Sequence, residues 1–231
     1  MKAIILAAGE GIRMRPLTLT TPKPLVKVGG KSLLERLVEK FPPTIDELII
    51  VTGYLAEQIE EFTKNGLLGR KVTCVRQPKK MGTYDALVYC RPFLEEGEKF
   101  LLFFADDLID NQIVTEMLKY DLAISVRETD SPRKFGIVAL DENNFVVDIV
   151  EKPENPPSNL ALANGYVLDT DIFNYSPELA PSGEYYLSVA AAKMAKNRKI
   201  KAVRANFWFP VGSPEAVIQA EEILKKETPT F

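Results

Sequence analysis

The residues best suited to chemistry lie near the amino terminus, where a glycine-bearing loop follows an apolar run. Residues 3–6 end in a loop that contains Gly9 and Gly11, and the cations Arg13 and Lys23 follow. Glycines let backbone N–H groups approach phosphate oxygens without a Cβ in the way. Arg13 can bind phosphate as a planar fork and Lys23 as a point charge. This arrangement suits a nucleoside triphosphate.

Neither of the familiar glycine motifs for phosphate binding fits this loop. The dinucleotide motif G-x-G-x-x-G lacks its third glycine, and the chain has no G-K-[ST] of a P-loop. A dehydrogenase is therefore a remote alternative, which failure to bind nicotinamide cofactors would remove.

The chain contains no histidine. This absence excludes Ser-His-Asp and Cys-His nucleophilic sites and zinc sites built on histidine. It does not exclude phosphoryl-type transfer. A phosphate monoester has a second pKa of about 6, so it is already an anionic nucleophile at neutral pH. Such a reaction needs positioning, charge neutralisation and a metal rather than a general base.

Composition narrows the class of protein. The 231 residues suit one large α/β domain or two small ones, and 46% hydrophobic residues can fill a core. A net charge of −3 argues against nucleic acid or an anionic membrane as the main partner. No apolar run reaches the roughly 18 residues of a membrane helix. Cys74 and Cys90 have neither metal spacing nor a disulfide framework, so we expect a cytoplasmic protein with reduced thiols.

Helical and strand patterns alternate along the first half of the chain, which predicts an α/β fold with a parallel sheet. A capping box at Ser32–Glu35 begins the first helix. Ligands bind such sheets at the carboxyl ends of the strands, where the first loop and the loops after Val75 and Ala105 lie. The expected helices cover 33–41, 56–62, 83–89 and 113–118, and the expected strands cover 3–6, 48–51, 71–75, 100–105 and 122–126.

The second half begins with a hairpin, residues 136–140 and 145–150 around a four-residue turn. Two amphipathic helices follow, at 187–196 and 214–224, and Ser213 caps the second. Because the chain ends soon after this helix, we expect no appended domain.

The loop 6–18, with Pro22-Lys23-Pro24 after it, resembles the signature of the sugar-nucleotide pyrophosphorylases. That signature reads roughly L-A-x-G-x-G-x-R-x-x-P-L-T, then P-K-x-L. The resemblance implies a Rossmann-like three-layer α/β sandwich with a mixed, mostly parallel central sheet. It also implies the reaction of a nucleoside triphosphate with a sugar 1-phosphate to give an NDP-sugar and pyrophosphate, with Mg²⁺ as cofactor.

Two further segments resemble the nucleotide-binding and metal-binding motifs of this family. The run Gln77 to Ala86 is similar to the motif Q-x-x-x-x-G-T-A-x-A, in which the glutamine amide and the glycine backbone contact the nucleotide base. The alternative is that this run is a turn that caps the next helix, and one segment can do both. Tyr84 replaces the usual alanine, and we expect it to narrow the pocket. Asp106 matches the family's Mg²⁺ aspartate, and we assign Asp107 and Asp110 to a solvated loop that caps the next helix.

The sugar side carries the resemblance further. Phe135-Gly136 and Glu151-Lys152-Pro153 match an aromatic-glycine pair and an E-K-P motif, and Asn164-Gly165-Tyr166 matches the segment that touches the hexose. Together the resemblance implies three sets of residues. They are the catalytic residues Arg13, Lys23 and Asp106, the last as metal ligand; the nucleotide-binding residues Leu6, Ala8, Gly9, Gly11, Gln77, Gly82 and Thr83; and the sugar-phosphate-binding residues Gly136, Glu151, Lys152 and Asn164.

The match weakens towards the carboxyl end. Val189 stands where G-E-x-x-L-T-D has its aspartate, and Pro210 replaces the second metal aspartate of W-x-D-x-G-T-P-E. Three explanations stay open: a metal held by Asp106, phosphates and water; a substitute acid such as Glu184; or reduced activity. A catalytically weak binding subunit is therefore the alternative function.

We expect a single domain over residues 1–231. Residues of about 1–130 would form the nucleotide half and about 131–231 the sugar-phosphate half. The base and the sugar stay open, with a weak lean towards a pyrimidine and a glucose-like sugar. Family members often self-associate, which leaves a homo-oligomer open.

Overall fold

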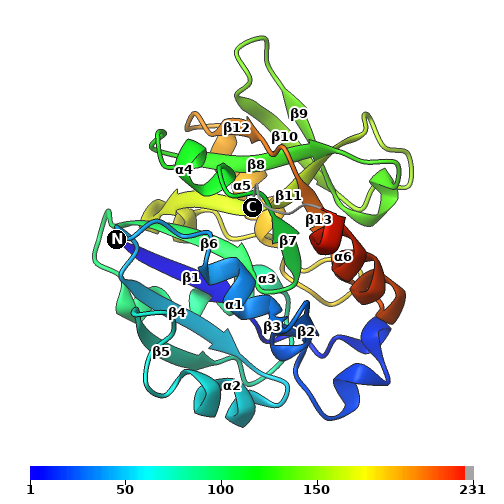
Figure 1. Cartoon of the computed structure of the whole chain (residues 1–231). Helices are drawn as coiled ribbons and strands as arrows, with labels where there is room; N and C mark the ends of the chain where they lie inside the picture. Colours follow the sequence, from blue (N-terminus) through cyan, green and yellow to red (C-terminus); the bar gives the residue numbers. More distant parts are fainter. Residues whose placement is uncertain (227–231) are drawn as a thin grey trace.

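The computed structural model describes residues 1–226, and its centre is a nine-stranded mixed sheet. The strand order is β10-β9-β11-β6-β1-β4-β5, and β8 and β12 continue from β11 on a branch (Figure 1). The end of the predicted domain, residues 227–231, lies outside the described residues.

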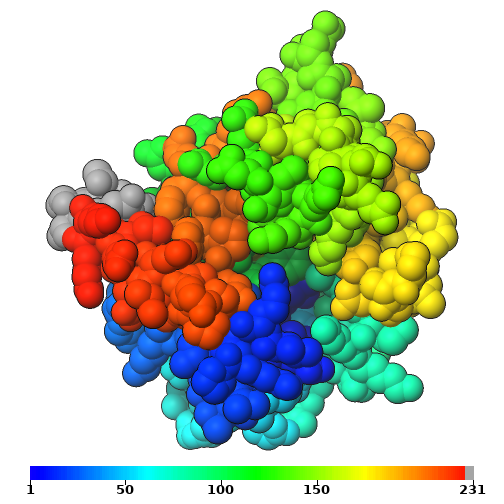
Figure 2. Space-filling model, turned by 90° about the vertical axis from the view of Figure 1, so that its right-hand side faces the viewer, coloured from blue at the N-terminus to red at the C-terminus, as the bar shows by residue number. Residues whose placement is uncertain are grey.

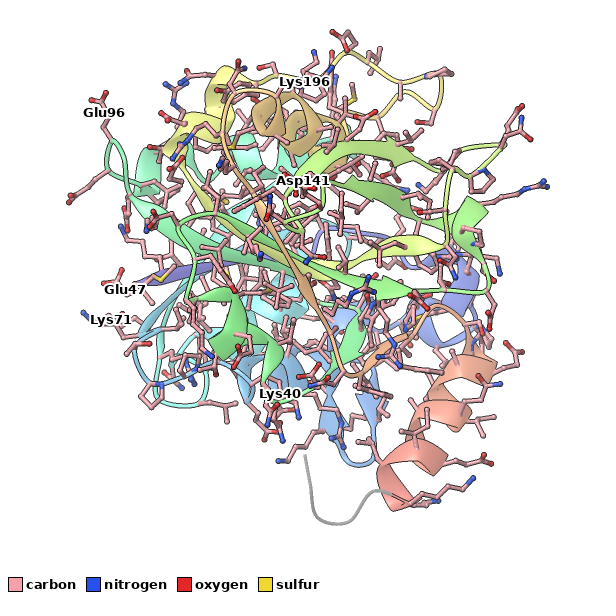
Figure 3. All side chains as sticks on the ribbon, turned by 90° about the horizontal axis from the view of Figure 1, so that it is seen from above. Lys40, Glu47, Lys71, Glu96, Asp141 and Lys196 are labelled. Carbon is pink, nitrogen blue, oxygen red and sulfur yellow. The ribbon has the colours of Figure 1, made fainter. Side chains whose placement is uncertain are left out.

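The first half of the chain forms the parallel part of the sheet. Its strands are β1 (Lys2–Leu6), β4 (Glu47–Thr52), β5 (Lys71–Arg76) and β6 (Lys99–Phe104). Their parallel register puts the carboxyl ends at one edge, as predicted. Glu47 and Lys71, which begin β4 and β5 and are partners in register, lie side by side at the opposite edge (Figure 3).

The second half adds strands to the same sheet. The predicted hairpin is β9 (Gly136–Leu140) and β10 (Val146–Glu151). The Asp141 carboxylate closes its turn by accepting from the N–H groups of Asn143 and Phe145 at 2.9 and 2.8 Å. Then β11 (Leu160–Asp169) pairs antiparallel with β6 and with β8 (Ala123–Glu128), and β12 (Lys201–Arg204) pairs parallel with β8.

Helices cover both faces of the sheet because each buried strand carries apolar side chains on both sides. In β1, Ile4 and Leu6 pack with α3 (Thr83–Val88) and α5 (Leu187–Ala195), whereas Ala3 and Ile5 pack on the other face. The helices of that other face are α1 (Leu33–Val38), α2 (Ala56–Thr63) and α4 (Ile113–Met117). The predicted three-layer sandwich is confirmed, and so is the capping box of α1.

A smaller cluster lies beside this sandwich. The last helix, α6 (Pro214–Lys226), packs next to a short ribbon of β2 (Lys27–Val28) and β3 (Lys31–Ser32). A second ribbon joins β7 (Asp107–Ile109) to β13 (Trp208–Pro210). Neither ribbon was predicted, because strands of two or three residues are too short for a periodic pattern.

No helix within residues 1–226 has the length and apolar character needed to cross a membrane.

Candidate active site

One cleft opens at the carboxyl ends of β1, β5 and β6 and continues to the hairpin. Its smaller part has a volume of about 200 Å³ and its wider part about 650 Å³, and both are lined by Lys23, Thr83 and Asp106. Figure 2 shows a hollow beside the amino-terminal segment (blue), below the green segment and next to the yellow one. Every site residue predicted from the sequence lines this cleft except Gly11.

Gly11 instead shapes the loop that enters the cleft. Its φ is +62°, and a Cβ there would lie 3.0 Å from the Thr18 side chain. The Thr18 hydroxyl donates to the Gly11 carbonyl at 2.8 Å and holds the turn. Within residues 1–226, the N–H groups of Gly9 and Gly11 donate to no other protein group. Backbone N–H groups without a protein acceptor can bind an anion, so the predicted role of the two glycines in phosphate binding stays a prediction.

Lys23 and Asp106 form an ion pair inside the cleft. Lys23 Nζ donates to Asp106 Oδ2 at 2.8 Å, with side-chain exposures of 11% and 39%. The loop after β1 and the end of β6 therefore bring together the two groups that the sequence assigned to phosphate and to metal. Arg13 enters from the same loop and lies against Gly212.

Asp107 does not belong to a solvated loop, so that prediction is wrong. The residue is 8% exposed, and its Oδ2 accepts from Trp208 Nε1 at 2.7 Å. Burial, and then the negative charge of Asp106, raise the pKa of the Asp107 carboxyl to about 8. Asp110 accepts from the N–H groups of Gln112 and Ile113 at the start of α4, but the N-cap residue is Gln112. Asp110 is also buried, so its placement in a solvated loop is wrong.

The loop 77–83 forms the wall of the smaller part of the cleft. Gly82 has φ +99°, and a Cβ there would lie 2.5 Å from the Tyr185 carbonyl oxygen. Only glycine fits this close approach. The Thr83 hydroxyl accepts from the Leu187 N–H at 2.9 Å, which fixes the loop against α5. Tyr84 does not narrow the pocket: its ring is buried in the core, and its hydroxyl lies 3.0 Å from Ser176 Oγ.

The hairpin supplies Glu151 at the end of β10. Gly136 is its partner in register, and a Cβ on Gly136 would lie 3.1 Å from Glu151 Oε2. The Ser188 hydroxyl donates to the same oxygen at 2.6 Å. A side chain at position 136 would displace this carboxylate, so the glycine in the aromatic-glycine pair keeps space for it.

Lys152 follows Glu151 in a left-handed conformation, φ +43°. Its Nζ lies 3.4 Å from Glu151 Oε1 and 4.7 Å from the centre of the Tyr186 ring. Burial lowers and the carboxylate of Glu151 raises the pKa of Lys152, and the net shift is upward. Lys152 therefore presents a positive charge at the wide part of the cleft.

Asn164 is buried, and its side-chain amide forms hydrogen bonds with the main chain. Oδ1 accepts from the Phe104 N–H at 2.7 Å, and Nδ2 donates to the Phe104 carbonyl at 3.0 Å. This pairing bridges β11 to β6 where the β11–β8 register shifts. Asn164 has φ +58°, a conformation that asparagine tolerates better than most residues.

The carboxylates of the cleft are compatible with a metal ion that is held partly by phosphate groups of a bound ligand. Pro210 lies opposite Asp107 in the ribbon of β7 and β13 and brings no side-chain ligand. Residues 1–226 contain no group of three or more His, Cys, Asp or Glu side chains placed to hold an ion. Mg²⁺ is usually held by one or two carboxylates plus phosphates and water, and the half-exposed Asp106 suits that role.

Sequence reasoning missed three residues that contact site residues, Asp85, Tyr186 and Ser188, and it placed Asp107 wrongly. Asp85 accepts a hydrogen bond from Gln77, which lies in the preceding loop, and Ser188 of α5 donates one to Glu151 of β10. Motif spacing in the sequence does not reveal such contacts. Ser188 lies in the segment that resembles G-E-x-x-L-T-D, and its hydroxyl was the available signal. Glu184, considered as a substitute acid, does line both parts of the cleft.

The model of the nucleotidyl transferase family matches residues 2–227. The bifunctional protein GlmU of Methanocaldococcus jannaschii is 34% identical over 227 residues, which are 97% of this chain and 54% of that protein. The chain thus spans about half the length of the GlmU relatives that it matches. The UTP–glucose-1-phosphate uridylyltransferase AglF of Haloferax volcanii is 30% identical, covering 99% of this chain and 98% of that protein.

A solved structure of similar extent is the UDP-glucose pyrophosphorylase in complex with UDP-glucose. Its TM-score is 0.87 at 25% identity, over 97% of this chain and 98% of that one. A glucose-1-phosphate thymidylyltransferase from Bacillus anthracis, at 24% identity and a TM-score of 0.84, shares the fold.

Proposed function

The chain belongs to the nucleotidyl transferase family, and from this premise we propose that it joins a nucleoside triphosphate to a sugar 1-phosphate. The products are an NDP-sugar and pyrophosphate. A relative that matches over nearly its whole length is named for the transfer of a uridylyl group from UTP to glucose 1-phosphate.

The observation that carries this proposal is that one cleft contains two separate groups of residues suited to binding phosphate. Free backbone N–H groups, Arg13 and the pair of Lys23 with Asp106 lie on the side of β1 and β6. A carboxylate and an ammonium, Glu151 and Lys152, lie on the hairpin side. A triphosphate and a phosphorylated sugar need these two sets of partners.

In the proposed reaction, a phosphate oxygen of the sugar 1-phosphate attacks the α-phosphorus of the nucleotide. The bond from that phosphorus to the oxygen bridging to the β-phosphate breaks, and pyrophosphate leaves with that electron pair. Lys152 binds the incoming phosphate, Lys23 neutralises the triphosphate near the reacting centre, and Arg13 stabilises the pyrophosphate. Glu151 accepts hydrogen bonds from sugar hydroxyls.

We assign Asp106 as the protein ligand of Mg²⁺. The bound ion would supply charge neutralisation to the phosphates. The contact of Asp106 with Lys23 keeps its carboxylate in the cleft, beside the loop that receives the triphosphate.

The test is pyrophosphate release over a grid of nucleoside triphosphates and sugar 1-phosphates, each with and without Mg²⁺. One strong pair with Mg²⁺ supports the proposal and identifies the base and sugar. No release over the whole grid, with nucleotide binding intact by calorimetry, contradicts it. That result would favour the alternative, a nucleotide-binding or sugar-nucleotide-binding subunit, which Pro210 opposite Asp107 motivates.

Two further properties are predicted for the protein. A cytoplasmic location follows from the composition, and two free cysteines agree with a reducing compartment. Self-association is the family expectation, and sedimentation of the purified protein tests it.

A further inference from the structure

The ammonium group of Lys152 has protein neighbours on two sides. Its Nζ lies 3.4 Å from Glu151 Oε1 and 4.7 Å from the centre of the Tyr186 ring. The Lys152 side chain is nevertheless 51% exposed, so burial alone does not fix it. A lysine side chain has a flexible stem of four carbons, and it loses much conformational freedom when one position is imposed on it. The two neighbours together define where this charge lies in the wide part of the cleft.

Tyr186 is held in place by the segment that carries it. It immediately precedes α5 as the N-cap residue. Before it, the N–H of Tyr185 donates to the Met81 carbonyl at 2.7 Å. After it, the N–H of Leu187 donates to the Thr83 hydroxyl at 2.9 Å. The ring is therefore carried by a stretch of main chain that the wall of the cleft holds at two points.

The chemistry of this contact suits a site that binds an anion. An aromatic face attracts a cation through the ring quadrupole and, unlike a carboxylate, does not neutralise its charge. The ammonium group also has three N–H donors. Because both Lys152 and Tyr186 line the cleft, the ring supports the ammonium group and leaves it accessible to a ligand.

We propose that Tyr186 is a positioning residue, whose ring holds the ammonium group of Lys152 where it binds the phosphate of the sugar 1-phosphate. This inference rests on the proposed function, since that function assigns the incoming phosphate to Lys152. Because Tyr186 acts through Lys152, removal of the ring weakens the binding of the sugar 1-phosphate and leaves that of the nucleotide unchanged. We expect the dissociation constant to rise on the order of fivefold, the usual weight of such a contact at a half-exposed site.

The experiment measures the dissociation constants of sugar 1-phosphates for the wild-type chain, Tyr186→Leu and Tyr186→Phe. Trp208, the only tryptophan of the chain, lines the wide part of the cleft, so its fluorescence reports binding there without turnover. Glucose 1-phosphate is the first probe, and the other sugar 1-phosphates of the grid follow. Tyr186→Leu removes the ring and raises the dissociation constant about fivefold. Tyr186→Phe keeps the ring, loses only the contact of the hydroxyl with Ser182 Oγ, and stays within about twofold of wild type.

Two comparisons separate positioning from a general loss of structure. Tyr120→Leu is the matched control, because it removes another ring that faces a lysine: its centre lies 5.8 Å from Lys201 Nζ, outside the cleft. The dissociation constant of this control equals that of wild type. In a Lys152→Met background, Tyr186→Leu has no further effect, because the contributions of two groups that act together are not additive. A ring that stacked directly on the sugar would instead cause the same loss in both backgrounds.

Three results would overturn the inference. Wild-type affinity in Tyr186→Leu would show that the ring does not position Lys152. An equal loss in both backgrounds would assign the ring to the sugar itself. Absence of measurable binding of every sugar 1-phosphate to the wild-type chain would remove the proposed ligand. If Tyr186→Leu does not fold by circular dichroism, Tyr186→Met, which also lacks a ring and adapts to irregular space, provides the same comparison.

The proposed function and this inference fail separately. Ring-dependent binding of a sugar 1-phosphate without pyrophosphate release over the grid contradicts the function and leaves the role of Tyr186 intact. Pyrophosphate release over the grid, with wild-type affinity in Tyr186→Leu, supports the function and overturns the role of Tyr186.

Discussion

The Ser188 hydroxyl donates a hydrogen bond of 2.6 Å to Oε2 of Glu151 and so ties the first turn of α5 to the end of β10. Ser188 is buried, and Lys152 Nζ lies 3.4 Å from the other carboxylate oxygen. The Glu151 carboxylate is therefore held from two sides. Such a fixed position suits the role that we propose for Glu151, accepting hydrogen bonds from sugar hydroxyls.

Ser188→Ala is expected to raise the KM for the sugar 1-phosphate about fivefold or more, because one support of Glu151 is lost. The KM for the nucleotide stays unchanged. Steady-state kinetics with each substrate varied in turn measures both. Ser158→Ala, in a loop outside the cleft, is the control. An equal rise in both KM values would show a general loss of structure instead.

Arg13→Ala is expected to lower kcat by about a hundredfold or more, the usual effect of removing one transition-state contact to developing charge. Arg15→Ala is a matched control, since Arg15 is an exposed cation in the same loop that does not line the cleft. Turnover of the Arg13 variant close to that of Arg15→Ala would contradict the role of Arg13.

Asp106→Ala is likewise expected to lower turnover by about a hundredfold or more, because it removes the proposed metal ligand and uncovers the charge of Lys23. Titration of Mg²⁺ against the protein–nucleotide complex should also show weaker metal binding. Asp148→Asn, on the hairpin outside the cleft, serves as the control. Normal turnover with normal Mg²⁺ dependence would refute the assignment.

Gly82→Ala should destabilise the fold by about 1–3 kcal/mol beyond Gly97→Ala. Both glycines have a positive φ, +99° and +74°, so both variants carry backbone strain. Only at Gly82 does the new Cβ meet another atom, the Tyr185 carbonyl oxygen at 2.5 Å; at Gly97 it meets open space. Urea unfolding of the two variants isolates this clash, and equal losses would exclude it.

Cys90 should resist alkylation in the native protein at pH 8.5. Burial raises the pKa of its thiol to about 12, above its ordinary value of 9.0, so the folded state holds the proton more tightly. In the folded protein the reactive thiolate therefore forms only as the pH approaches about 12. The thiol of the unfolded chain ionises from about pH 9, so the free energy of unfolding falls as the pH rises above that value. Iodoacetamide labelling followed by mass spectrometry tests this, and labelling in urea is the control. Rapid native labelling would show that the helix–sheet layer around Cys90 opens.

The elements that could be predicted from sequence are those whose signal is local. The capping box of α1 needs only Ser32 and Glu35, and the apolar run of β1 and the glycine loop after it are contiguous. Parallel strands then bring the loop, Asp106 and Gln77 to one edge without further information.

Contacts between distant segments could not be predicted. Asp107 is buried because Trp208, about a hundred residues later, donates to it. The effect of Tyr84 was wrongly predicted because it depends on which face of α3 the residue occupies, and that face packs on the core instead of the cleft. Orientation across elements is a tertiary property that motif spacing does not contain.

The side-chain amide of Asn164 takes the place of a backbone peptide group in the sheet, because it forms hydrogen bonds with both the N–H and the carbonyl of Phe104. It repairs the ladder where β11 departs from regular register, and the repair lies two residues before Asp106. The sheet thus runs without a break from β1 and β6 to the strands of the hairpin. One continuous sheet forms the floor of the cleft, which favours a constant separation between the side chains proposed for the nucleotide and those proposed for the sugar phosphate.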